Sequence, residues 1–155
     1  MGSYGQNSSL SAELIMELSV KIAPPLLIGP TKNGYRKVIP IVGGSFSGQR
    51  LRGEVIPGGA DWNTAYGSDP EGSDALRHIF AKYTLRTEDG ICIGVENEGW
   101  KSADLTHMTQ IVTIPKFQVS APQYDWLNYG VFVGSLSPVP CAAEPTMSIR
   151  IYRMN

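Results

Sequence analysis

An aspartate and a tryptophan follow a pair of glycines near the middle of the chain, and their side chains are well suited to chemistry. A carboxyl group that is buried beside an indole, as Asp61 would be beside Trp62, has a raised pKa and can act as a general acid or base. Gly58 and Gly59 permit a tight bend that would direct both side chains into the mouth of a barrel. The alternative is structural: Asp61 accepts N–H bonds within a turn, and Trp62 plugs the barrel end.

Two arginines and a tyrosine extend this candidate catalytic set. Arg52 and Arg86 carry a fixed positive charge that suits a phenolate, enolate or carboxylate, and the Tyr83 hydroxyl can donate a proton. Each arginine alternates with the aliphatic residues of its segment, so a surface ion pair with Glu54 or Glu88 is the competing interpretation. Tyr83 is also consistent with a core tyrosine that makes one hydrogen bond.

Four residues in the second half of the chain join Trp62 as candidate substrate-binding residues. They are Lys116, Tyr124, Trp126 and Asn128. Aromatic rings with a few convergent polar groups suit an aromatic or polyketide-like ligand. The same aromatic residues are also consistent with an ordinary core.

Several functional signatures are missing from the sequence. It has no phosphate-binding loop of the Gly-x-x-x-x-Gly-Lys-Ser/Thr type, no dinucleotide-binding fingerprint and no Gly-x-Ser-x-Gly elbow. His78 and His107 are the two histidines, and no spacing joins them to carboxylates in a metal-binding pattern. We therefore expect no cofactor and no metal site.

Composition and charge narrow the classes of partner. The formal net charge of -1 leaves no basic field to hold nucleic acid or an anionic membrane surface. No run approaches the ~18 apolar residues of a membrane span. Residues 1–12 are polar, rich in Gly and Ser, and lack the apolar core of a signal peptide. We therefore expect a flexible lead-in over residues 1–12, a single domain over residues 13–155 and a cytoplasmic protein.

Alternating apolar and polar residues predict an all-β protein. The predicted strands cover residues 14–22, 26–28, 36–42, 46–56, 79–86, 91–95, 109–117, 127–133 and 146–152. Eight or nine short strands, without a helix of ~10 residues, indicate an antiparallel barrel or sandwich. The glycine pairs mark points where the sheet must bend, and the loop over residues 66–74 is a candidate lid.

Three segments in collinear order resemble the family catalogued as domain of unknown function 3237. They read GGSFSGQRLRGEVIPGGADW from residue 43, KYTLRTEDG from residue 82 and APQYDWLN from residue 121, and the resemblance spans residues 18–133. It implies a single antiparallel β-barrel, similar to lipocalins or allene-oxide cyclases, and a mostly uncharacterised function. The chain departs from the family in a longer, more acidic loop over residues 65–79 and in residues 134–144, which leaves the choice of substrate open.

The predicted function is that of a cofactor-independent cyclase or isomerase, which acts on a hydrophobic oxygenated small molecule inside the barrel. This rests on the clustered polar groups and, by analogy of fold, on the chemistry of cyclase barrels. A non-catalytic, lipocalin-like binding protein is the alternative, and a purely structural oligomeric barrel is a third possibility. We also expect a homo-oligomer, because subunit contacts often cover exposed apolar strand faces.

Overall fold

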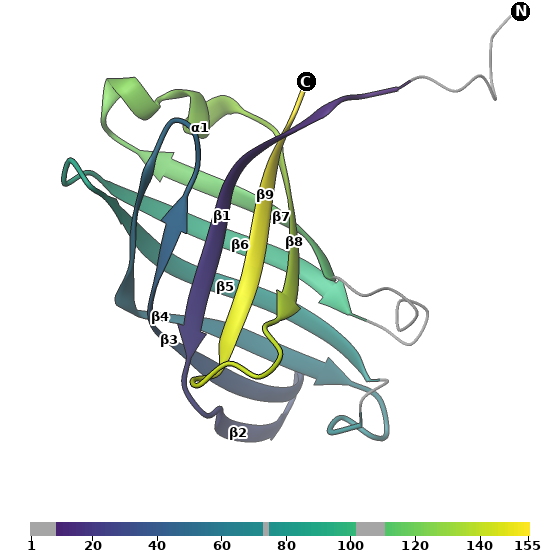
Figure 1. The fold of residues 1–155 in the computed structure, drawn as a ribbon. Helices are drawn as coiled ribbons and strands as arrows, with labels where there is room; N and C mark the ends of the chain where they lie inside the picture. Colours follow the sequence, from purple (N-terminus) through teal and green to yellow (C-terminus); the bar gives the residue numbers. More distant parts are fainter. Residues whose placement is uncertain (1–8, 73–74, 102–110) are drawn as a thin grey trace, which may run out of the picture.

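The protein is a β-barrel in which eight strands close into a ring and one further strand extends the sheet (Figure 1). The computed structural model describes residues 9–72, 75–101 and 111–155. The strands are β1 (Ala12–Ile22), β2 (Leu26–Thr31), β3 (Gly34–Ser47), β4 (Arg52–Tyr66), β5 (Leu76–Thr87), β6 (Cys92–Lys101), β7 (Ile111–Val119), β8 (Phe132–Pro138) and β9 (Thr146–Met154). All neighbours pair antiparallel, which confirms the predicted fold class.

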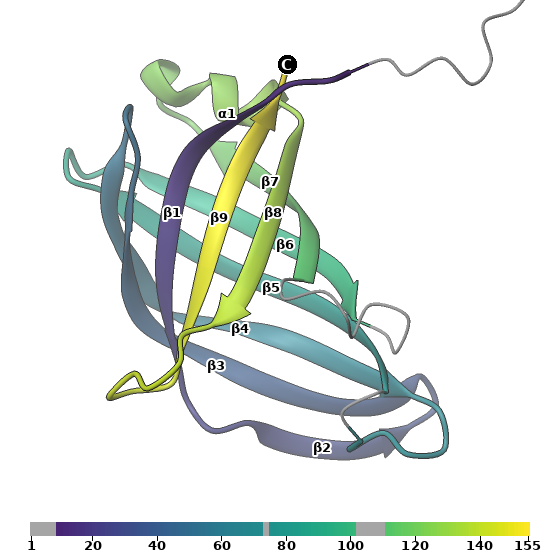
Figure 2. The same cartoon turned by 45° about the vertical axis from the view of Figure 1, so that its right-hand side comes forward.

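The ring closes because β1 pairs with β9 on one side and with β3 on the other. Figure 2 shows β1, β9 and β8 side by side at the front of the barrel. β1 covers residues 41–47 of β3, and β2 pairs with residues 34–38 of the same strand. Almost the whole edge of β3 is therefore paired, so β3 itself presents little of the open edge on which sheets aggregate.

Among the described residues, no helix is both long enough and apolar enough to span a membrane.

Both glycine pairs lie at bends within long strands, where the register shifts. In β3 the shift falls between Ile41 and Ser45, and in β4 between Ile56 and Ala60. An extra residue on one strand of a pair bends that strand and increases its twist, as barrel closure requires. The bends that the glycine pairs predict are thus present, in the form of bulges.

The core lies inside the barrel and consists of side chains that alternate along each strand. Its fully buried aliphatic members include Met16, Val55, Leu85, Ile93 and Ile151. A short 3-10 turn η2 (Pro122–Tyr124) and helix α1 (Trp126–Tyr129) lie at one end of the barrel, while β2 lies at the other (Figure 1). The barrel thus has one end covered by the α1 segment.

Two predicted strands are wrong. Residues 127–133 begin in helix α1, and the strand starts only at Phe132, because the Asn128 side chain binds the main-chain N–H and C=O of Val119 and fixes a turn. Residues 46–56 are not one strand, because β3 ends at Ser47 and β4 starts at Arg52. Periodicity does not reveal either break, since local side-chain hydrogen bonds and turns interrupt a continuous apolar pattern.

Gly43 and Gly44 offer a matched test of the closure. Both have positive φ, but an added Cβ on Gly44 would lie 2.0 Å from the Ser19 carbonyl oxygen of β1, whereas an added Cβ on Gly43 meets nothing within 4 Å. We expect Gly43→Ala to cost about 1–2 kcal/mol of stability from backbone strain alone. Gly44→Ala should cost clearly more, because it also forces β1 away from β3. Urea denaturation of both variants checks this, and equal losses would contradict the closure argument.

Candidate functional site

Asp61 lies on the inner face of the barrel, and Trp62 lies on the outer face. Asp61 pairs with Ala81 of β5, whose neighbours two residues away, Ile79 and Tyr83, are buried. The Trp62 side chain is 45% exposed. Successive side chains of a strand point to opposite faces, so the two residues cannot line the same cavity. The structure therefore separates the carboxylate from the indole beside which it was expected to act.

The Asp61 carboxylate is held by two donors. Its Oδ1 accepts the main-chain N–H of Phe80 at 3.0 Å, and its Oδ2 accepts the Nδ2 amide of Asn63 at 3.3 Å. Burial raises the pKa of Asp61, and these two hydrogen bonds offset part of that rise, together with the nearby charge of Lys37. A carboxyl group with a raised pKa and a fixed orientation can transfer protons.

A lysine and an arginine lie close to Asp61. Lys37 of β3 pairs with Asn63 in the sheet, and Arg77 Nη1 donates to Asn63 Oδ1 at 3.4 Å. Burial lowers the pKa of Lys37, and the positive charges of Arg77 and Lys101 add to the effect, while Asp61 opposes it. Asp61 thus belongs to a polar cluster, which we call the Asp61 cluster: Lys37, Asp61, Asn63 and Arg77.

Sequence reasoning missed Lys37, Asn63 and Arg77. Polar residues in an alternating strand pattern are normally assigned to the solvent face, and these three lie on the inner face. Asn63 could have been found as the residue two positions after Asp61, because it shares the same face of β4. Lys37 and Arg77 carry no such signal, since only the pairing register brings β3 and β5 to the same place.

The loop after β4 is tied to this end of the barrel. Arg77 Nη2 donates to the Pro70 carbonyl at 2.8 Å, and the Tyr35 hydroxyl donates to Glu71 Oε1 at 3.1 Å. Part of the predicted lid, residues 73–74, lies outside the described residues. The described part of the loop therefore contacts the Asp61 cluster through Arg77.

Tyr83 is buried in the barrel, only 4% exposed, two residues along β5 from the partner of Asp61. Burial raises the pKa of its hydroxyl, so Tyr83 stays protonated and can donate a hydrogen bond. Among the described residues its hydroxyl has no hydrogen-bond partner, so the structure does not show the core tyrosine with one hydrogen bond, and the role of proton donor stays a prediction.

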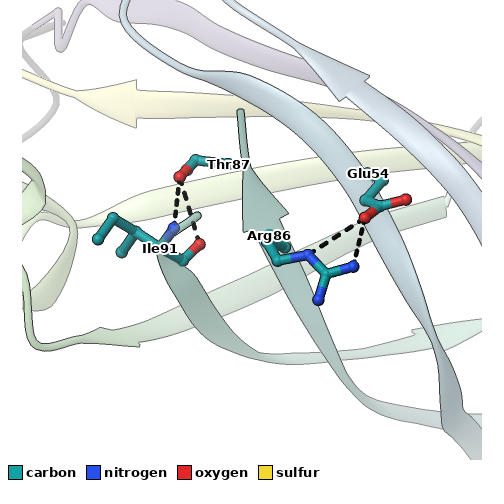
Figure 3. Close-up of polar contacts among 4 residues, drawn as sticks. All are labelled: Glu54, Arg86, Thr87 and Ile91. Carbon is teal, nitrogen blue, oxygen red and sulfur yellow. Dashed lines mark hydrogen bonds and ion pairs between the residues drawn. The ribbon is translucent and has the colours of Figure 1, made fainter. Parts of the chain in front are cut away.

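Arg52 and Arg86 lie on the outer face in ion pairs. Arg86 Nη2 lies 2.6 Å from Glu54 Oε1, and Arg52 Nε lies 3.5 Å from Glu88 Oε2. Figure 3 shows Arg86 and Glu54 directed toward one another, while Thr87, the next residue, binds the main chain of Ile91 on the other side. This is the surface pairing that was the competing interpretation, and neither arginine contacts the Asp61 cluster.

Tyr124, Trp126 and Asn128 lie at the α1 end of the barrel. The Tyr124 hydroxyl donates to Asp89 Oδ1 at 3.0 Å, and the Arg50 guanidinium lies 4.2 Å from the centre of the Trp126 ring. Asn128 is bound to the last residue of β7. These contacts hold the covering segment in place, at the end of the barrel opposite β2 (Figure 1).

Lys116 is exposed on β7 and lines a groove of about 880 Å³. The groove extends from the bend in β4 at Gly58 to helix α1, where Asn128 also lines it. Lys82 and Glu96, which also line it, form an ion pair of 3.6 Å. The structure thus brings two of the predicted substrate-binding residues together in this groove.

Trp62 belongs to an apolar surface on the outer face of β4 to β7. We call it the aromatic surface, and its members are Trp62, Tyr66, Leu76, His78, Trp100, Val112 and Ile114. The rings of His78 and Trp100 have centroids 4.6 Å apart, and His78 Nε2 lies 2.6 Å from Glu98 Oε2. Apart from His78, each member is at least 38% exposed. Exposed apolar patches of this kind often mark interaction sites.

The sequence matches the model of the family described as Protein of unknown function (DUF3237) over residues 10–154. The chain belongs to this family. The resemblance found in its motifs is thereby confirmed. A UPF0311 protein of Clostridium acetobutylicum is 29% identical over 145 residues, which cover 84% of this chain and 88% of that protein. A UPF0311 protein of Rhodopseudomonas palustris is 28% identical over 140 residues, which cover 82% of this chain and 88% of that protein.

Solved structures share the fold of this DUF3237 protein. A crystal structure of a protein with unknown function from Clostridium acetobutylicum has a TM-score of 0.79 at 25% identity, with 97% of this chain and 100% of that chain covered. A beta-barrel like protein from Acinetobacter baumannii has a TM-score of 0.78 at 28% identity, with 97% and 99% covered. An enzyme from Penicillium herquei has a TM-score of 0.70 at 19% identity over both whole chains, which shows the fold alone.

The raised pKa of Asp61 predicts a particular pH dependence of stability. The folded protein binds this proton more tightly than the unfolded chain, so the stabilisation is present at low pH and is lost as the pH rises through the folded-state value. The substitution Asp61→Asn mimics the protonated acid at every pH. We expect the stability of this variant relative to the native protein to increase as the pH rises from about 4 to 7. Denaturation at several pH values measures the difference.

Asp89→Asn is a control of opposite sign. Hydrogen bonds from Thr87 and then Tyr124 lower the pKa of Asp89, so its carboxylate stabilises the fold above the unfolded-state value. The relative stability of this variant should therefore fall as the pH rises through the acidic range. A pH-independent difference for Asp61→Asn would show that burial of Asp61 does not affect its titration.

Proposed function

We propose that this DUF3237 barrel catalyses cofactor-independent proton transfer, in the isomerisation or cyclisation of a hydrophobic oxygenated small molecule. The observation that carries the proposal is the inward-facing, half-buried Asp61 carboxylate, which Phe80 and Asn63 orient. The charge of Lys37 acts on it, and Arg77 binds its partner Asn63. Within the described structure, this is the place where a proton-transfer group and positive charge lie together on the inner face of the barrel.

The roles follow from the chemistry of each group. Asp61 removes a proton from one atom of the substrate and returns it to another, so the overall reaction neither consumes nor releases a proton. Lys37 and Arg77 stabilise the negative charge that develops on the substrate oxygen, a role for which Arg52 and Arg86 lie too far outside. Tyr83, which remains protonated, donates a hydrogen bond or a proton from deeper in the barrel.

The neighbour from Penicillium herquei is called an enzyme. That description supports the view that a barrel of this fold can serve as a catalytic scaffold. The reaction class of the present chain rests on the Asp61 cluster itself, because fold alone does not specify function. The competing proposal is a carrier, in which the same interior binds a small molecule without chemistry.

Deuterium exchange into a simple ketone tests the proposal. We expect the protein to accelerate incorporation of deuterium from heavy water next to the carbonyl of 2-tetralone, a hydrophobic ketone that forms an enol. Asp61→Asn should lower the rate by about 10²- to 10⁴-fold, which is the usual contribution of a general base. Mass spectrometry of the ketone measures the rate.

A matched control is Glu17→Gln, which removes an exposed carboxylate that pairs with Arg150 at 3.0 Å on the outer face of the barrel. This variant should exchange deuterium at the native rate. Binding of 2-tetralone with exchange no faster than in buffer would favour the carrier. Acceleration that is unchanged in Asp61→Asn would remove Asp61 from the mechanism.

We further propose that a second copy of the chain covers the aromatic surface. With three exposed aromatic residues and three exposed aliphatic ones, the surface presents on the order of 500 Å² of apolar area, within reach of the ~800 Å² that each partner buries in a standard interface. Its histidine, His78, already has a partner within the chain, because its Nε2 lies 2.6 Å from Glu98 Oε2. A symmetric pairing of two such faces can therefore leave this contact intact.

Ile114→Lys tests this assembly. Ile114 is 63% exposed in the aromatic surface, so a lysine there is harmless to a monomer but places a charge in the interface. Light scattering after size exclusion should show an oligomer for the native protein and a monomer for the variant. Val139→Lys, at a residue 38% exposed outside the surface, should leave the mass unchanged. A monomeric native protein would refute the proposal.

A further inference from the structure

We propose that Tyr83, Asn97 and Thr113 form a polar wall deep in the barrel that binds a hydroxyl group of the substrate. The inference rests on the proposed function, because it places the bound molecule beside Asp61. It adds two residues, Asn97 and Thr113, that determine specificity, and it names the group that they recognise.

The three residues are buried polar groups with unmet hydrogen-bonding capacity. Tyr83 is 4% exposed, Asn97 is 2% exposed and Thr113 is fully buried. Within the described parts of the chain, Tyr83 Oη, Asn97 Oδ1 and Thr113 Oγ1 have no hydrogen-bond partner. Buried polar atoms of native proteins are nearly always paired, and each unpaired one destabilises the fold. Three such atoms on one part of the inner face require an explanation.

The sheet register places these residues on one diagonal of the inner face. Tyr83 pairs with Val95, two residues before Asn97, and Asn97 pairs with Pro115, two residues after Thr113. Diagonal neighbours of this kind are ~7–8 Å apart, within reach of a single small molecule. The polar wall therefore crosses β5, β6 and β7 as a continuous feature.

The same register connects the wall to Asp61. Ala81 pairs with Asp61 on one side and with Asn97 on the other. Its side chain is a single methyl group, and the residue is half-buried although it faces inward. No larger side chain of β5 therefore stands between the carboxylate and the wall. At Gly134 an added Cβ would lie 2.5 Å from Thr113 Oγ1, so only a glycine can pack against this hydroxyl from β8.

The chemistry of the three atoms selects the ligand. Asn97 Oδ1 can only accept a hydrogen bond, so its partner must be a donor, whereas the hydroxyls of Tyr83 and Thr113 can donate or accept. A ligand hydroxyl satisfies both requirements, because it donates to the amide oxygen and accepts from a protein hydroxyl. A purely hydrocarbon ligand would leave all three atoms unpaired. The class of ligand is thus an apolar molecule that carries a hydroxyl group.

Phenol and toluene form a matched pair of probes, because they differ by a hydroxyl in place of a methyl group. We expect the native protein to bind phenol more tightly than toluene, as measured by calorimetry or ligand-observed NMR. Thr113→Val, which keeps the shape of the side chain, should reduce this preference about twofold to tenfold, the effect of one hydrogen bond. Thr113→Ser, which keeps the hydroxyl, should retain the preference. Asn97→Leu should reduce it in the same way as Thr113→Val.

Stability gives an independent readout. If the wall exists for a ligand, Thr113→Val should unfold at the same temperature as the native protein or at a higher one, since it removes an unpaired buried oxygen. A lower unfolding temperature combined with an unchanged phenol preference would overturn the inference, as would a native protein without any preference. If the native protein catalyses deuterium exchange through Asp61 but binds phenol no more tightly than toluene, the polar wall is refuted and the proposed catalysis stands. A phenol preference without exchange would refute catalysis and retain the wall.

Discussion

The close approach of β1 to β3 is the constraint on which the structure depends. The Ser19 carbonyl occupies the space that any side chain at position 44 would need. Without this contact β1 would pair only with β9, and the sheet would remain open. The inner face exists as a shielded surface because the ring is closed, so the burial of Asp61 and the aliphatic core both derive from a glycine in β3.

The alternation of side chains along β4 then divides the functional residues between two surfaces. Asp61 and Asn63 face inward and connect to Arg77 through hydrogen bonds, while Trp62 faces outward. Around the Asp61 cluster the strands therefore carry polar side chains on the inner face and the aromatic surface on the outer face. This locally reverses the usual pattern of a half-exposed sheet, in which the outer face is polar. Elsewhere on β4 and β5 the usual pattern holds, with Leu85 buried inside and the Arg86–Glu54 ion pair outside. Within these strands, the two surfaces that we consider functional lie back to back, one strand thickness apart.

Much of the fold could be predicted from the sequence, because alternation, turns and glycine pairs are local signals. The family followed from three motifs in order, which the match over residues 10–154 confirms. The helix at Trp126–Tyr129 could not be predicted, because the hydrogen bonds of Asn128 that fix it involve β7. For the site, Asp61 lies on the inner face and its role stays a prediction, whereas the positions of Lys37 and Arg77 depend on the register between strands. Trp62 shows the limit of sequence proximity, since adjacent residues in a strand face apart.

The bulge between Ile56 and Ala60 has a consequence for how chain length can vary in this region. From the bulge to the end of β4, every residue is assigned to a face by its odd or even position. Insertion or deletion of one residue there would exchange the faces, so that the indole entered the barrel and the carboxylate met solvent. A change of two residues would preserve both. Length variation in homologous barrels should therefore be restricted to even steps between the bulge and the acid, and unrestricted in the loop beyond Tyr66.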